Sequence, residues 1–171
     1  MKKLIPAAIL LSLVVLASCD PETGRLALSG RAQVNDGTSN PQSYDITIGL
    51  FPEGIAFEAD GVVIYGVDPD LRSVAPLVSV KASVSGNYSI EFPEDLSSVS
   101  QMAAWADLND DGVYQMTEPG LLPTKTVGET DVVVTGWSVV GDLLSALDFE
   151  GSTYDLDAIG AGGFDFSFYL E

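Results

Sequence analysis

Residues 107–118 have the residue types and the spacing of a cation-binding loop. They match D-x-N-x-D-G-x5-E at every specified position, a pattern in which residues spaced along a tight loop supply oxygen ligands. Ca²⁺ is a hard cation that takes about six to eight oxygens, and one short loop can provide most of them. The sequence therefore predicts a calcium site, and Ca²⁺ is the only cofactor that it predicts.

The expected metal ligands are Asp107, Asn109, Asp111, Val113, Gln115 and Glu118. The first three would supply side-chain oxygens, and Gly112 at position six permits the sharp turn. Val113 can offer only its backbone carbonyl, and Gln115 would ligate directly or through a water. Glu118 would close the shell with both carboxylate oxygens. The competing interpretation is an acidic hairpin turn followed by an unrelated glutamate.

The flanks of the loop exclude a helix–loop–helix calcium site. Pro119, Gly120 and Pro123 follow the loop and would prevent an exiting helix. Residues 99–106 before the loop read as a strand in their hairpin-rich context. A single loop also lacks the partner loop of a paired calcium switch, so we expect an isolated site between strands.

In the rest of the chain, short segments in which apolar and polar residues alternate are separated by turn residues. This pattern predicts strands. The expected strands are 25–34, 44–51, 62–67, 77–84, 88–92, 132–140 and 164–170. A Gly-containing connection at 85–87 predicts a hairpin, 155–163 predicts a loop, and 143–147 fits either a strand or a helical turn. The fold class predicted for 25–171 is all-β, a single antiparallel β-sandwich of transthyretin-like or immunoglobulin-like type.

Two sequence motifs of this chain resemble those of a known family. Gly86, Tyr88 and Ile90 form a G-x-Y-x-I strand, which precedes a strand ending in D-x-N-x-D-G. This arrangement resembles the transthyretin-like, carboxypeptidase-regulatory-like domains of extracellular bacterial proteins. The resemblance implies a sandwich with an acidic loop at one end and an accessory role in stability or attachment. The chain departs from that family after Val140.

The N-terminus reads as an export signal. Lys2 and Lys3 precede an apolar run at 4–16, which is too short for a membrane-spanning helix. The run ends in Leu-Ala-Ser-Cys, which resembles the lipobox of bacterial lipoproteins. The resemblance implies cleavage before Cys19 and lipidation of its thiol. We therefore expect a signal peptide at 1–18, a stalk at 19–24 and the β-sandwich at 25–171, and we call the chain from Cys19 onward the mature protein.

Charge and composition narrow the function classes. The formal net charge of −18 becomes −20 once the two leader lysines are removed, and such a surface repels nucleic acid. The chain contains no histidine, so it lacks the commonest general base and the usual Ser-His and Cys-His pairs. Lys81 and Lys125 are conceivable bases, but neither follows a serine at Ser-x-x-Lys spacing. We expect a protein that is not an enzyme.

Together these features predict a membrane-anchored, calcium-binding β-sandwich lipoprotein with a structural or recognition role at the bacterial cell envelope. It would face the periplasm or the exterior, and its lipid anchor would be its membrane contact. An envelope protein or a polysaccharide remains open as its partner. One alternative is a carbohydrate-binding module that uses exposed aromatics, with Trp105 and Trp137 as a stacking platform assisted by Tyr65, Tyr88 or Tyr114. A hydrolase that uses paired carboxylates is the third.

Overall fold

The computed structural model describes residues 25–34, 45–52, 57–60, 63–66, 73–115, 117–140, 143–148 and 150–168. At 57–60, 63–66 and 73 it describes the backbone alone. The expected signal peptide, the stalk and Cys19 lie outside the described residues.

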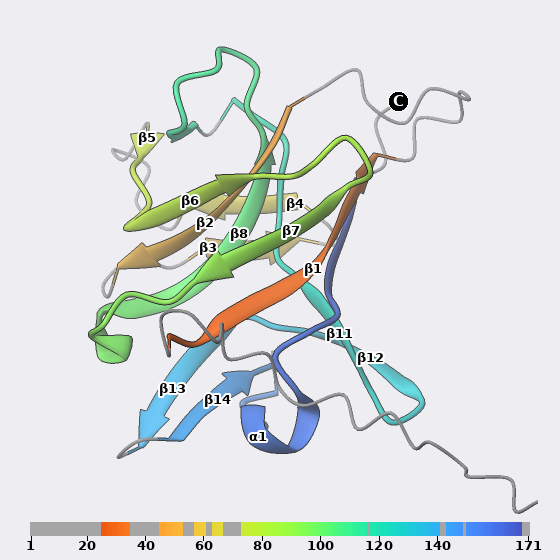
Figure 1. The fold of residues 1–171 in the computed structure, drawn as a ribbon. Coiled ribbons are helices and arrows are strands. Elements are labelled where there is room, and N and C mark those ends of the chain that lie inside the picture. Colours follow the sequence, from red (N-terminus) through yellow and green to blue (C-terminus); the bar gives the residue numbers. More distant parts are fainter. Residues whose placement is uncertain are drawn as a thin grey trace, which may run out of the picture.

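Two larger sheets form the body of the molecule (Figure 1). The five-stranded sheet has the order β12 (Thr130–Val133), β11 (Thr124–Val127), β16 (Phe164–Phe168), β1 (Ala27–Val34), β7 (Asn87–Glu91). The four-stranded sheet has the order β10 (Gly120–Leu121), β8 (Val99–Ala106), β2 (Ile46–Pro52), β6 (Val78–Lys81). The sheets pack against each other, so the predicted all-β sandwich is confirmed.

Smaller elements complete the fold. A three-stranded sheet consists of β13 (Gly136–Val140), β14 (Leu143–Leu147) and β15 (Thr153–Asp155). Two ribbons pair β3 (Phe57–Asp60) with β4 (Val63–Gly66) and β5 (Ser73–Val74) with β9 (Tyr114–Gln115). The described helices are the short η1 (Leu96–Ser98) and α1 (Leu156–Ile159).

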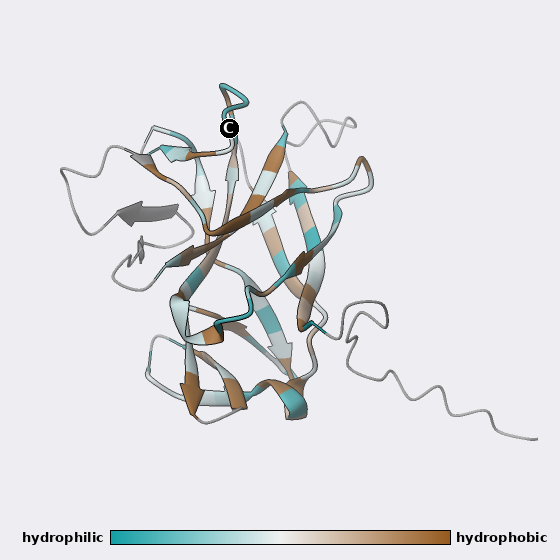
Figure 2. Ribbon diagram, turned by 60° about the vertical axis from the view of Figure 1, so that its left-hand side comes forward, coloured by the Kyte–Doolittle hydropathy of each residue, from teal (hydrophilic) through white to brown (hydrophobic). Residues whose placement is uncertain are grey.

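The main core follows from alternation along the strands, which Figure 2 shows as changes of colour along single arrows. In β16, Phe164, Phe166 and Phe168 are buried, whereas the residues between them are exposed. Phe164 contacts the Trp137 ring at 5.5 Å between centroids, and Phe166 contacts Tyr88 at 5.8 Å. The C-terminal aromatics therefore pack in the core, as their period of two predicts.

Strand β8 is buried on both of its faces. Met102, Ala104 and Ala106 belong to the main core. Ala103 and Trp105 face the other way, into a second cluster. The second cluster comprises Phe51, Val74, Ala103, Trp105, Tyr114 and Leu122. The strand that leads into the acidic loop is thus held from both sides.

The predicted hairpin at 85–87 is wrong. Strand β6 pairs with β2 in one sheet, whereas β7 pairs with β1 in the other, so this connection carries the chain between layers. The local turn is still present, because the Gly86 amide donates to the Ser83 carbonyl at 2.7 Å. One pairing, β1 with β16, is parallel, whereas the pairings of the four-stranded sheet are antiparallel.

The predicted strand at 132–140 is divided between two sheets. The Val134 amide donates to the Pro123 carbonyl, and the next amide, of Thr135, donates to the Leu147 carbonyl, both at 2.8 Å. The backbone therefore changes partner between adjacent residues, which lie between the end of β12 at Val133 and the start of β13 at Gly136. The stretch left open at 143–147 is strand β14, and the predicted loop at 155–163 contains α1.

Candidate metal centre

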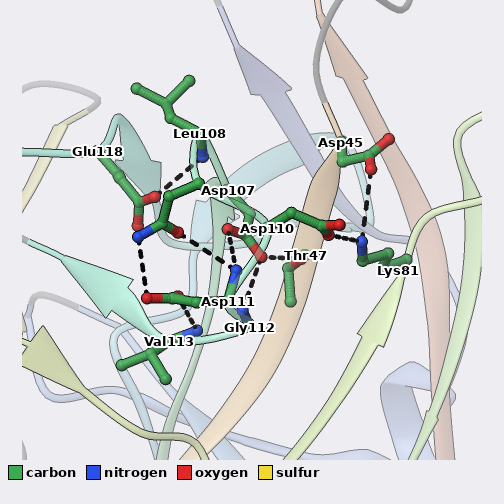
Figure 3. A network of polar contacts seen from close by, with 11 residues as sticks. Asp45, Thr47, Lys81, Asp107, Leu108, Asp110, Asp111, Gly112, Val113 and Glu118 are labelled. Atoms are coloured by element: carbon green, nitrogen blue, oxygen red, sulfur yellow. Dashed lines mark hydrogen bonds and ion pairs between the residues drawn. The ribbon is translucent and has the colours of Figure 1, made fainter.

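The loop begins directly after β8, and hydrogen bonds hold its two ends together. The Ala106 amide donates to the Pro119 carbonyl at 2.9 Å, and the Asp107 amide donates to the Asp45 carbonyl at 3.0 Å. The Glu118 amide donates to the Gln115 carbonyl at 2.8 Å. These backbone bonds bring the two ends of the loop together, and Figure 3 shows Asp107 and Glu118, the first and last predicted ligands, on the same side of it.

Two residues in the loop have left-handed backbone conformations. Gly112 has φ +72°, and nothing lies within 4 Å of the position of a Cβ there, so the conformation rather than space requires glycine. Asp110 has φ +59°, which aspartate tolerates better than most residues. The sharp turn predicted at position six is present.

Asp107 and Glu118 are the two buried carboxylates of the loop, each 5% exposed. The Asp107 oxygens accept from the Asp111 amide at 3.1 Å and from the Gly112 amide at 2.9 Å. The Thr47 hydroxyl, 3.4 Å from Asp107 Oδ2, adds a weaker contact. The Asp107 side chain is therefore held by two amides of the loop and by Thr47 of β2.

Glu118 accepts one backbone hydrogen bond on each oxygen. The Leu108 amide donates to Oε1 at 2.9 Å and the Gln115 amide to Oε2 at 3.0 Å. An ionised carboxylate has about four acceptor sites, so both oxygens keep a lone pair for a cation. Glu118 thus closes the loop, which is the position that the calcium pattern assigns to it.

Asp111 is more exposed, and its hydrogen bonds favour the ionised form of its carboxyl group. The backbone hydrogen bond from Val113 lowers the pKa of its carboxyl group, and bonds from Asn109 and Gln115 act in the same direction against desolvation. The three donor–acceptor distances are 2.8, 2.9 and 2.9 Å. Four of the six predicted ligands therefore contact one another here.

Asp110 belongs to a different group. In Figure 3 it extends toward Lys81, on the side of the loop away from Glu118. Lys81 forms ion pairs with Asp110 and, at 3.4 Å, with Asp45. The hydrogen bond to Asp110, joined by the one to Asp45, raises the pKa of the Lys81 ammonium group despite partial desolvation. This lysine neutralises the outer side of the loop.

The described residues contain no group of three or more His, Cys, Asp or Glu side chains arranged to hold a metal ion as they stand. The loop carboxylates turn to amide donors instead. The donor set nevertheless fits a calcium loop, in which carboxylates share the shell with amide and backbone oxygens. Asp107, Asn109, Asp111, Val113, Gln115 and Glu118 would hold the ion, with Ca²⁺ supplying the missing positive charge.

Sequence patterns missed Asp45 and Thr47, which contribute from β2 and its start. Both contact Asp107 because β2 lies beside β8 in the sheet, with Thr47 opposite Trp105. A local motif carries no signal for such a neighbour. Only the strand order, which alternation does not determine, would have identified them.

The aromatic residues proposed as a sugar platform are mostly in the interior. Trp105, Trp137, Tyr88 and Tyr114 are buried, and the side chain of Tyr65 lies outside the part of the chain that the structure describes. Trp137 packs against Phe92 at 5.6 Å between ring centroids. The carbohydrate-binding alternative requires a row of exposed aromatic side chains. These four residues do not form such a row.

Comparisons with protein-family models, with curated proteins and with solved structures give no match to this chain. Among the described residues, no helix has the length and apolar character needed to cross a membrane. The class of the protein shown here is that of an all-β sandwich with an acidic loop between β8 and β10 that includes β9.

Proposed function

We propose that this protein is a non-enzymatic lipoprotein of the bacterial cell envelope, in which one calcium ion stabilises the loop at 107–118. Its role would be structural or recognition rather than catalysis. The calcium site is supported by the complete loop pattern, by the left-handed turn at Gly112 and by the inward carboxylates.

One observation carries the calcium proposal. Asp107 and Glu118 are nearly fully buried, yet neither forms an ion pair with a basic side chain within the described residues. A buried carboxylate is costly unless hydrogen bonds and a counter-charge compensate it. Backbone amides supply the hydrogen bonds. The nearby Lys81 forms its ion pairs with Asp110 and Asp45 on the outer side of the loop. A bound cation supplies the charge that remains missing.

The envelope location rests on the sequence. The leader, the lipobox-like Leu-Ala-Ser-Cys and the single cysteine of the chain support lipidation at Cys19. A stalk of six residues reaches at most roughly 20 Å at ~3.3 Å per residue, so the domain would stay close to the bilayer. An extracytoplasmic setting would also supply millimolar calcium for a loop of modest affinity.

A melting experiment tests the calcium proposal. Calcium that binds only the folded mature protein should stabilise it by RT ln(1 + [L]/Kd), about 2.7 kcal/mol at a hundredfold excess. Millimolar Ca²⁺ should then raise the melting temperature by several degrees, and Mg²⁺ should do less because it keeps its waters. The control is Glu118→Gln, which keeps the size but removes a charge. Equal melting of both proteins at every calcium concentration would reduce the loop to an acidic turn.

A further inference from the structure

The second cluster lies directly beside the loop, on the same face of the sheet. Along β8, Trp105 and Asp107 alternate onto one side, and Thr47 of β2 lies opposite Trp105 and contacts Asp107. The Trp105 indole packs so close to β2 that a Cβ at Gly49 would lie 2.9 Å from its ring. The apolar cluster and the acidic loop are therefore neighbours.

The cover over this cluster is a two-stranded ribbon. Strand β9 pairs with β5, with Tyr114 opposite Val74 and Gln115 opposite Ser73. Tyr114 and Val74 are both buried, and the Tyr114 ring meets Trp105 at 6.1 Å between centroids. We call the β5–β9 ribbon the cap.

The cap and the loop share backbone. Tyr114 and Gln115 of the cap occupy positions eight and nine of the loop pattern. The Glu118 carboxylate accepts from the Gln115 amide at 3.0 Å, and the Gln115 carbonyl accepts from the Glu118 amide at 2.8 Å. The same side chain that would ligate calcium thus fastens the cap.

We infer that calcium controls the cap: the ion holds β5–β9 closed over Trp105, and its release lets the ribbon open and uncovers an apolar face beside the loop. This inference rests on the proposed calcium site. Without the ion, repulsion among Asp107, Asp111 and Glu118 pushes the loop apart. A ribbon with two residues in each strand has too few backbone hydrogen bonds to stay in place alone.

Amide hydrogen exchange of the mature protein, with Ca²⁺ or with a chelator, measures the coupling. If the cap opens only after calcium leaves, exchange at Tyr114 and Gln115 slows by 1 + [L]/Kd, about a hundredfold at a hundredfold excess. The β11–β12 hairpin, which can fray without the loop, serves as the internal control and keeps its rate. Calorimetric titration of the same sample measures binding separately.

A second measurement follows the cluster itself. The chain has two tryptophans, so Trp137→Phe leaves Trp105 as the reporter and Trp105→Phe leaves Trp137 in the main core. Chelation should red-shift the emission of the Trp137→Phe protein and increase its quenching by acrylamide. The Trp105→Phe protein should not respond. The exchange experiment needs no variant, so it still tests whether calcium controls the cap if either substitution prevents folding.

The outcomes separate the two proposals. Calcium binding with slowed cap exchange supports both. Calcium binding with unchanged cap exchange overturns the inference and leaves the calcium site standing. Absence of binding heat together with unchanged exchange overturns the calcium site, and the inference falls with it.

Discussion

Asp107 and Asp110 lie in the same loop, yet their carboxylates face different surroundings. Asp107 is buried and accepts hydrogen bonds from loop amides. Asp110 is exposed and forms an ion pair with Lys81. Residue type alone does not distinguish them, but their positions in the loop pattern do, because the pattern specifies position one and leaves position four free.

This contrast gives a matched pair of variants. Asp107→Asn and Asp110→Asn each remove one negative charge from the loop. Asp107→Asn should lose most of the calcium-dependent stabilisation, about 2.7 kcal/mol at a hundredfold excess over the wild-type Kd. Asp110→Asn should keep it, because that carboxylate faces Lys81. Urea unfolding with and without calcium measures both.

Equal loss of the calcium effect in the two variants would show that the loop responds to total charge rather than to a coordinated ion. Asp110→Asn should by itself change stability little, since water and salt screen an exposed ion pair.

Among the secondary-structure elements, a side-chain hydrogen bond joins β7 to β16 across β1, which lies between them. The Tyr88 hydroxyl donates to the Phe164 carbonyl at 2.6 Å. Burial, with the nearby charge of Asp165, raises the pKa of the Tyr88 phenol, so the group remains a donor at neutral pH. Tyr88 is the tyrosine of the G-x-Y-x-I strand, so the motif residue has a structural role.

Tyr88→Phe should therefore reduce the free energy of unfolding by about 1–3 kcal/mol, because it leaves a buried carbonyl without its partner. Tyr154→Phe is the control, since its hydroxyl donates at 2.8 Å to Asp148 at a more exposed site. That loss should be clearly smaller, because water can replace the bond at the more exposed site. Chemical denaturation compares the two, and similar losses would contradict the importance of burial for the Tyr88 bond.

Alternation and turn residues predicted most of the long strands and the position of the acidic loop. Phe164, Phe166 and Phe168 illustrate why, since each repeats the core-facing position of a two-residue period. The same patterns could not show which strands pair. The break at Val134 and Thr135 depends on Pro123 and Leu147, which are distant in sequence. The contacts of Asp45 and Thr47 with the loop depend on strand order for the same reason.

Over the whole molecule, charge and the expected anchor act together. Loss of the expected leader would change the formal net charge from −18 to −20, and one bound Ca²⁺ would offset only a small part of it. In the proposed lipoprotein, attachment to a bilayer would then come from lipid rather than from electrostatic attraction to anionic headgroups. This makes the cysteine the deciding residue for location.

Cys19→Ser tests that expectation. In a bacterium that processes lipoproteins, the wild-type protein should fractionate with membranes, and the variant should be soluble or remain uncleaved. Immunoblots of membrane and soluble fractions, with the mass of each form, provide the measurement. A variant that is still processed and membrane-bound would show that membrane attachment does not depend on lipidation of Cys19.

The most direct test of the central claim is calorimetric titration of the mature protein with calcium. We predict one binding site with a Kd of ~0.1–1 mM, as in extracellular calcium modules, with weaker binding of Mg²⁺ and no binding by Glu118→Gln. A titration without saturable heat up to several times that range, or one unchanged by Glu118→Gln, would contradict a calcium site at 107–118.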